Sequence, residues 1–90
     1  MKIKKIPKEI LIYAFIYNNK NCYLLEISKK LNITYSYAQN IMKYAQKKKI
    51  LTVEKIGRKN KINFTFDFLP FGKICNDFLI EANKIKGDKN

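Results

Sequence analysis

The segment at residues 50–66 constrains the fold most, because it predicts two short strands joined by a basic turn. Residues 50–56 (ILTVEKI) are rich in β-branched side chains, and residues 62–66 (INFTF) alternate between apolar and polar ones. The intervening residues 57–61 (GRKNK) hold a glycine and three cations. The segment therefore predicts a β-hairpin with a flexible basic tip.

Residues 35–48 (YSYAQNIMKYAQKK) predict an α-helix with one apolar face. Its apolar side chains recur at the short spacings of a helix that packs on a core. Thr34 suits the N-cap position, because its hydroxyl can accept a hydrogen bond from a first-turn N–H. The inward positions are Ala38, Ile41, Met42 and Ala45. The positions outward or at the rim are Tyr35, Ser36, Tyr37, Gln39, Asn40 and Lys43.

The chain before this helix predicts two shorter helices separated by asparagine-rich turns. Pro7 suits a first helical turn, where its missing N–H needs no partner. Asparagine tolerates left-handed backbone angles, so runs of it favour turns. The expected elements are a helix at 8–18, a turn at 18–21, a very short strand at Cys22 and Tyr23, a helix at 24–31 and a tight turn at 32–33. The apolar side of the second helix is expected to hold Leu24, Leu25, Ile27 and Leu31.

A last helix is expected at residues 70–85, opened by Pro70. Its apolar stripe, at spacings of three and four, is Phe71, Ile74, Cys75, Phe78, Leu79, Ala82 and Ile85. This stripe exceeds what one small core needs, so part of it is expected to form a homodimer contact. The residues expected in that contact are Phe71, Ile74, Phe78 and Leu79. The alternative is that these four side chains all pack inside one monomer.

The charge of the chain is strongly positive and unevenly placed. Lys and Arg number 19 against 7 Asp and Glu, a net charge of +12, which favours a polyanionic partner such as nucleic acid. Residues 43–61 hold eight of these cations and one acid, Glu54, whereas residues 67–81 hold three acids and one cation, Lys73. A uniform solubilising surface would not segregate in this way.

Several classes of function are excluded by composition. The chain has no histidine and its two cysteines, Cys22 and Cys75, are far apart, so neither a zinc site nor a histidine-dependent catalytic centre is expected. The three glycines form no phosphate-binding loop. The longest apolar run, residues 10–17, has eight residues, and a spanning helix needs about 20. We expect no enzyme, no cofactor, no metal and no membrane segment, and a reducing cytoplasm as the setting.

The order of these elements is the layout of a winged helix-turn-helix domain. Residues 24–66 (LLEISKKLNITYSYAQNIMKYAQKKKILTVEKIGRKNKINFTF) resemble the DNA-binding core of winged-helix transcription regulators of the MarR type and their relatives. The resemblance implies an α+β fold with a three-helix core, a two-stranded β-hairpin wing at about 51–66 and a C-terminal helix. Ninety residues suit one domain, over 1–90. Residues 35–48 would then be the recognition helix.

Two residues depart from the pattern of that family. Lys49 stands where such domains usually carry glycine, so we expect the turn after the recognition helix to be made differently. Ala45 replaces the usual leucine and leaves a smaller core contact. The chain also lacks the long extra helices with which MarR proteins dimerise and hold small ligands, so no small-molecule ligand is predicted.

Double-stranded DNA is the expected partner, read in a sequence-specific way by a transcription regulator. Gln and Asn side chains can pair with adenine in the major groove, and cations contact phosphates or the minor groove. The candidate base contacts are Tyr35, Ser36, Tyr37, Gln39, Asn40 and Lys43. The candidate backbone or minor-groove contacts are Thr34, Lys47, Lys48, Arg58, Lys59 and Lys61.

Other interpretations of the same features stay open. An architectural protein that coats DNA with little sequence preference would also need the basic face. A winged helix can instead serve as a protein–protein interaction module, with lysines facing an acidic partner. For single residues, Tyr37 could cap the core rather than reach DNA, and Arg58 could be a solvated turn residue.

Overall fold

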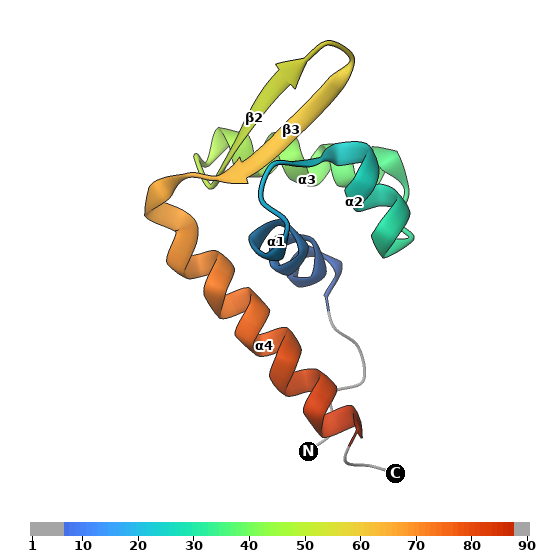
Figure 1. Cartoon of the computed structure of the whole chain (residues 1–90), viewed down its shortest axis with the longest axis vertical. Coiled ribbons are helices and arrows are strands. Elements are labelled where there is room, and N and C mark those ends of the chain that lie inside the picture. The colour runs from blue at the N-terminus through green and yellow to red at the C-terminus, as the bar shows by residue number, and fades with distance from the viewer. Residues whose placement is uncertain (1–6, 88–90) are drawn as a thin grey trace.

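A computed structural model describes residues 7–87 of the chain, with side chains as far as Asn83. The elements in order are α1 (Lys8–Asn18), β1 (Cys22–Tyr23), α2 (Leu24–Leu31), α3 (Tyr35–Lys47), β2 (Leu51–Ile56), β3 (Lys59–Phe64), the short 3-10 helix η1 (Phe66–Phe68) and α4 (Leu69–Gly87). Figure 1 shows α1, α2 and α3 grouped beneath the β2–β3 hairpin. This is the α+β winged helix-turn-helix architecture that the sequence predicts.

The described strands form one antiparallel sheet in the order β1-β3-β2. The very short strand expected at Cys22 and Tyr23 is present, and Cys22 pairs with Ile62. Strand β3 ends at Phe64, two residues before the expected end. Thr65 leaves the sheet because its N–H donates to the Ile50 carbonyl at 3.0 Å and its Oγ1 donates to the Lys49 carbonyl at 2.8 Å.

The core lies where the three-helix group meets the sheet. Its largest fully buried side chains are Ile12, Ile16, Ile27, Leu51 and Ile62. They come from α1, α2, β2 and β3, so removing any one of these elements would expose the others. Alternation along β3 explains the inward position of Ile62, since its neighbours in the strand point to the opposite face.

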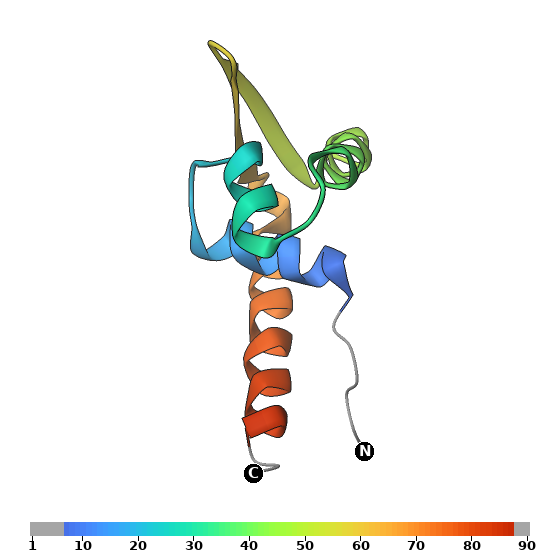
Figure 2. The same cartoon turned by 90° about the vertical axis from the view of Figure 1, so that its right-hand side faces the viewer.

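Helix α4 packs on α1 near its own N-terminus and then extends away from the body (Figures 1 and 2). The ring of Phe71 meets that of Tyr13 edge-on, with centroids 5.0 Å apart. Gly72 lets the start of α4 lie close to Phe64, because a Cβ at this position would be 2.7 Å from the Phe64 ring. The helix begins at Leu69, so Pro70 lies within the first turn rather than opening it.

The turn after α3 corrects one expectation from the sequence. Lys49 has a φ of 61°, so the turn has the left-handed geometry that glycine normally provides. The N–H of Ile50 donates to the Ala45 carbonyl and that of Lys49 to the Gln46 carbonyl, the Schellman pattern of a helix end. The expectation of a different turn was wrong because the backbone hydrogen bonds hold a lysine in this conformation.

A second correction concerns the apolar side of α2. Leu24 and Ile27 are buried and Leu31 is half-buried, but Leu25 is 54% exposed. Consecutive helical residues are turned by about 100° from one another, so Leu25 cannot share the face of Leu24.

Candidate nucleic-acid interface

The helix-turn-helix is fixed by short hydrogen bonds around the turn between α2 and α3. Asn32 ends α2 in the left-handed conformation, with a φ of 55°. The hydroxyl of Ser28 donates to the Ile33 carbonyl at 2.9 Å, and the Ile33 N–H donates back to the Ser28 carbonyl at 3.1 Å. These bonds set the angle at which α3 leaves α2.

Helix α3 begins with the predicted N-cap. The Tyr37 N–H donates to Thr34 Oγ1 at 3.1 Å, which satisfies one free donor of the first turn. Ala38, Met42 and Ala45 are buried, as the periodicity predicts, and Ile41 is half-buried. The inward face is therefore the expected one, and it determines which side chains α3 presents to solvent.

The exposed face of α3 is a continuous polar and basic stripe. Its members recur every three or four residues, so they lie along one side of the helix. All of them are exposed: Ser36, Asn40, Lys43 and Lys47 in the stripe, and Gln39 beside it. The stripe and the adjoining Gln39 together offer two amides that can pair with bases and two lysines that can contact phosphates.

The two tyrosines of the first turn lie in different surroundings. Tyr35 is exposed on the side of α3 that faces α2 and the tip of the hairpin. Tyr37 is half-buried against the core, and Lys8 Nζ lies 5.7 Å from the centroid of its ring. The position of Tyr37 favours a role in covering the core, while its contact with DNA stays a prediction.

One exposed aromatic residue of α3 was missed by the sequence analysis. Tyr44 is 56% exposed, and Lys48 Nζ lies 5.9 Å from its ring centroid. Two turns before it, Tyr37 lies on the same side of the helix at a spacing of seven residues. That spacing was the signal that could have found Tyr44. Lys47 and Lys48 are both exposed at the C-terminal end of α3.

The β2–β3 hairpin, called the wing below, has two cations that contact other side chains of the chain and two that are exposed to solvent. Lys61 Nζ lies 3.3 Å from a carboxylate oxygen of Glu54, and Lys59 Nζ lies 5.0 Å from the ring centroid of Tyr23. Arg58 and Lys55 are exposed. Gly57 forms the tip with a φ of 61°. Lys55 was not among the candidates from sequence, although its alternation with Glu54 places it on the other face of the strand.

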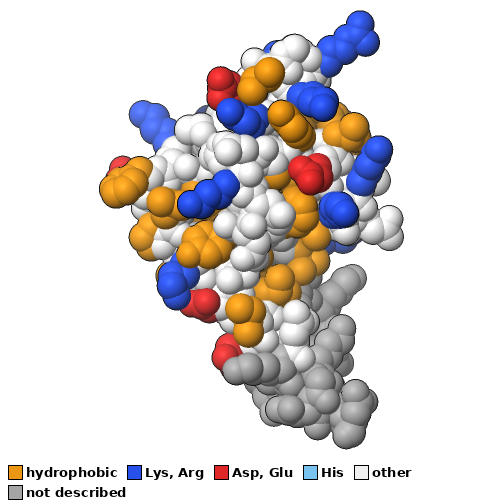
Figure 3. Space-filling view, viewed as in Figure 1, with side chains coloured by type: hydrophobic (Ala, Val, Ile, Leu, Met, Phe, Trp, Pro, Cys, Tyr) orange, Lys and Arg blue, Asp and Glu red, His pale blue; other side chains and the backbone are white. Residues whose placement is uncertain are grey.

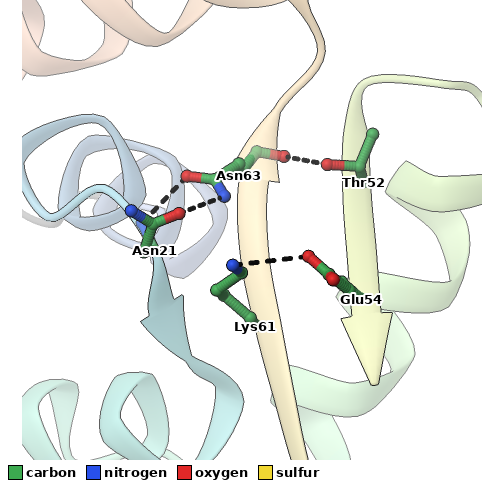
Figure 4. A network of polar contacts seen from close by, with 5 residues as sticks. All are labelled: Asn21, Thr52, Glu54, Lys61 and Asn63. Atoms are coloured by element: carbon green, nitrogen blue, oxygen red, sulfur yellow. Dashed lines mark hydrogen bonds and ion pairs between the residues drawn. The ribbon is translucent and has the colours of Figure 1, made fainter. Parts of the chain in front are cut away.

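The base of the wing is held by a pair of asparagine side chains, shown in Figure 4. The backbone N–H of Asn21 donates to Asn63 Oδ1 at 2.8 Å, and Asn63 Nδ2 donates to Asn21 Oδ1 at 2.9 Å. Thr52 Oγ1 donates to the Asn63 carbonyl at 3.4 Å. Residues from β2, β3 and the turn before β1 are thereby joined, which fixes the wing relative to the helices.

The apolar stripe of α4 divides into a buried and an exposed part. Cys75 and Ala82 are buried, and Phe71 and Leu79 are half-buried against the core. Ile74 is 65% exposed and Phe78 is 39% exposed. The side chain of Ile85 lies outside the described residues. Of the four residues expected at a dimer contact, Ile74 and Phe78 thus have the larger free surface.

Helix α4 carries an ion pair between Lys73 and Asp77. Lys73 Nζ donates to an Asp77 carboxylate oxygen at 3.1 Å, and this contact raises the pKa of Lys73. Figure 3 shows most of the basic side chains on this face in the upper part of the view, around the wing and α2, together with some acidic ones, and further acidic side chains lower down beside α4.

The cysteines give no sign of a reactive or metal-binding role. Both Cys22 and Cys75 are free and buried, and burial raises the pKa of the Cys22 thiol to about 11. Among the described residues, no cluster of three His, Cys, Asp or Glu side chains could hold a metal ion. No helix within the same residues is long and apolar enough to cross a membrane.

The three-helix group and its wing define a winged helix-turn-helix fold, and solved structures share it. AF1382 from Archaeoglobus fulgidus is 24% identical, covers 80% of this chain and 84% of its own, and has a TM-score of 0.72. F-93 of SSV1 is 12% identical over 94% of this chain and 99% of its own, with a TM-score of 0.78.

A third similar structure is that of a regulator solved with DNA. The Staphylococcus aureus MepR–DNA complex is 12% identical over 98% of this chain and 67% of its own, with a TM-score of 0.80. MepR is a transcription regulator of the multidrug efflux pump MepA. No protein-family model and no curated protein matches the sequence. These likenesses show the winged-helix fold that the sequence predicts.

Proposed function

We propose that this protein is a sequence-specific double-stranded DNA-binding protein that regulates transcription in the cytoplasm. The observation that carries the proposal is the exposed stripe of α3, where Asn40 lies between Ser36 and Lys43 with Gln39 beside it. A stripe of this kind suits the major groove, whose base edges present donors and acceptors to amide side chains.

The position of the wing supports this mode of binding. The asparagine pair Asn21–Asn63 holds the base of the wing, while Arg58 is exposed at its tip. A recognition helix in the major groove brings the wing to the flanking backbone or minor groove, where a cation is favoured. The similar fold of MepR, solved as a DNA complex, adds support from a protein of known partner.

A homodimer is part of the proposal, because a single recognition helix covers only a short half-site. A two-fold dimer reads two half-sites about one helical turn apart and gains specificity from their spacing. The contact is proposed on α4, chiefly through Ile74 and Phe78, with Phe71 and Leu79 at its edge. The acidic groups of α4 support this orientation, since they would be repelled by DNA.

The experiment is to select binding sites from random duplex DNA and to measure affinities on the best site and on unrelated DNA. Gln39→Ala and Asn40→Ala should each cost about 1–3 kcal/mol on the best site and little on unrelated DNA. Lys47→Ala should weaken both by a similar factor, because a phosphate contact carries no direct sequence information. Asn83→Ala is the matched control, an exposed amide on α4 that should change neither affinity.

The outcome separates the proposal from its alternatives. Equal losses on both DNAs for the Gln39 and Asn40 variants would favour an architectural protein. Absence of DNA binding even at low salt would favour a protein–protein interaction module. A sequence-specific regulator should also show affinity that falls steeply with salt, with a slope of about −0.9 per phosphate neutralised.

A further inference from the structure

The junction between the wing and α4 carries two exposed apolar side chains. It lies at the base of the wing, at the opposite end of the hairpin from the tip (Figure 1). Phe66, in η1, is 85% exposed, more than any other large apolar side chain that the structure describes. The Leu69 N–H donates to the Phe66 carbonyl and closes one 3-10 turn. Residues three apart in such a turn are eclipsed, so Phe66 and Leu69 lie on the same side of it.

Leu69 also forms part of the wall of a small hollow. The volume of the hollow is about 210 Å³, below the range of about 300–1,000 Å³ that is typical of small-molecule sites. Its apolar lining is Ile16, Tyr17, Phe64 and Leu69, and its polar lining is Lys20 and Asn63. The Asn63 amide is already bonded to Asn21, so the hollow suits one apolar side chain better than a polar ligand.

Opposite charges accompany the exposed ring and the hollow. Asp67 follows Phe66 in η1, and Lys20 lines the hollow. Both side chains are exposed, and neither takes part in an ion pair among the residues that the structure describes. The surface thus holds a projecting ring beside an acid and a hollow beside a base. Such a surface is complementary to a second copy of itself.

We propose that this surface is a self-association contact, in which two copies of the chain meet about a two-fold axis. Phe66 of each copy enters the hollow of the other, and Asp67 of each copy pairs with Lys20 of the other. The two Leu69 side chains meet near the axis. Every contact away from the axis occurs twice, as a two-fold arrangement requires. The contact is separate from the one proposed on α4, because neither Ile74 nor Phe78 lines the hollow.

The contact is small, and interfaces that bury less than about 1,200 Å² are weak and transient. We expect a dissociation constant on the order of 0.1–1 mM for the free protein. Two copies bound at neighbouring sites on one DNA molecule have a much higher effective concentration, so the same contact would stabilise them there. This consequence for DNA binding rests on the proposed function, whereas the contact between free chains does not.

The first test measures association without DNA in the Ile74→Glu chain, in which the contact proposed on α4 is removed. Sedimentation equilibrium between about 10 μM and 1 mM protein should show monomer and dimer. Adding Phe66→Ser should weaken the association about tenfold or more, because two phenyl rings lose their burial. Leu25→Ser is the matched control, an exposed apolar residue on α2, and should change the constant less than about twofold.

Charge exchange tests the ion pair between the copies. Asp67→Lys and Lys20→Asp, each on its own, place like charges together twice in the two-fold contact, so each should weaken self-association. A mixture of the two variants brings opposite charges together at both places, and a heterodimer should form with roughly the wild-type affinity. Mixing cannot restore a contact within one chain.

Three results would overturn the proposal. One is an Ile74→Glu chain that stays monomeric up to about 1 mM. Another is association that Phe66→Ser leaves unchanged or that Leu25→Ser weakens equally. The third is failure of the mixed charge variants to associate. Should Ile74→Glu unfold by circular dichroism, the wild-type chain carries the same series of variants. Identical association of wild type and Ile74→Glu would instead contradict the dimer on α4 and leave this contact intact.

A second measurement addresses the role on DNA. Duplexes with two copies of the best site at a series of spacings should be filled cooperatively by the wild type at the spacings where the two surfaces meet. Phe66→Ser should fill them independently and keep its affinity for a single site. Independent filling by the wild type at every spacing would disprove the role on DNA. A wild-type protein that associates as expected but binds no DNA would contradict the proposed function alone.

Discussion

The ammonium nitrogen of Lys61 lies 3.3 Å from a carboxylate oxygen of Glu54, directly across the two strands of the wing. The Glu54 side chain is 68% exposed, so the pair adds little to stability. Its consequence is electrostatic, because Glu54 neutralises one of the cations that a basic wing offers to DNA. Arg58 lies in the turn beyond the last pair of the two strands, Ile56 and Lys59, so no acidic residue is paired with it in the sheet.

The first prediction follows from this pairing. Arg58→Ala should reduce the salt dependence of DNA binding by about 0.9 in slope, the effect of one lost phosphate contact. Lys61→Ala should reduce it by clearly less, because Glu54 already competes for that charge. Glu54→Gln should increase DNA affinity by freeing Lys61. Fluorescence anisotropy across a salt series measures all three, and equal slopes for Arg58→Ala and Lys61→Ala would contradict the argument.

The second prediction concerns the left-handed residue after α3. Lys49→Gly should stabilise the protein by about 1 kcal/mol, since glycine adopts a positive φ without the steric cost that a lysine Cβ incurs. Lys48→Gly, at a φ of −84°, is the matched control and should destabilise by roughly 0.5–1 kcal/mol. Urea denaturation at neutral pH gives both values. A loss of stability in Lys49→Gly would show that the lysine side chain makes a contact worth more than the strain.

The third prediction uses the raised pKa of Cys22. With a pKa of about 11, the thiol is almost entirely protonated at pH 8, with a thiolate fraction of about one in a thousand. Folding favours the protonated thiol, so this contribution to stability is present below pH 9 and is lost as the pH rises towards 11. In a Cys75→Ala background, Ellman's reagent should therefore label native protein far more slowly than urea-unfolded protein. Equal rates would show that Cys22 is accessible.

Much of the fold could be predicted because its signals are local. The apolar period of α3 and its Thr34 cap depend on residues close in sequence, and the structure confirms them. The expected alternation over residues 62–66 holds for Ile62 and Phe64 but was wrong at Phe66, which lies beyond the strand and is 85% exposed. The early end of β3 depended instead on Thr65, whose hydrogen bonds reach back to the turn after α3. A contact between distant segments leaves no periodic trace in the sequence.

The candidate site was less predictable, since it depends on which side chains meet. From sequence, Lys61 was expected to be a cation available to DNA. The register of β2 and β3 instead places it opposite Glu54, with which it forms an ion pair. Leu25 was expected inside and instead lines a trough whose other wall comes from the wing, more than thirty residues later in the chain. Tyr35 and the exposed amides of α3 were found from sequence because helix geometry alone determines their orientation.

The proposed dimer contact rests on the division of α4 into a buried and an exposed part. The ring centroid of Phe71 lies 5.0 Å from that of Tyr13 and 6.3 Å from that of Phe68. Phe71 therefore belongs to an aromatic cluster inside one chain. Ile74 and Phe78 lie on the outer side of the same helix and keep a large exposed surface. Helix α4 extends away from the wing in both views (Figures 1 and 2), which supports the proposal that a second copy binds there.

The last prediction is that Ile74→Glu converts a dimer into a folded monomer, because it places a charge in the contact without disturbing the core. The wild-type dimer should bury about 1,200 Å² or more in total, with Phe78 near the centre. Sedimentation velocity at micromolar protein without DNA measures the state, and circular dichroism reports the fold. Phe71→Glu is the contrasting variant and should unfold the chain. A wild-type monomer would disprove the dimer, and unfolding of Ile74→Glu would show that Ile74 supports the fold of one chain instead of a contact between two.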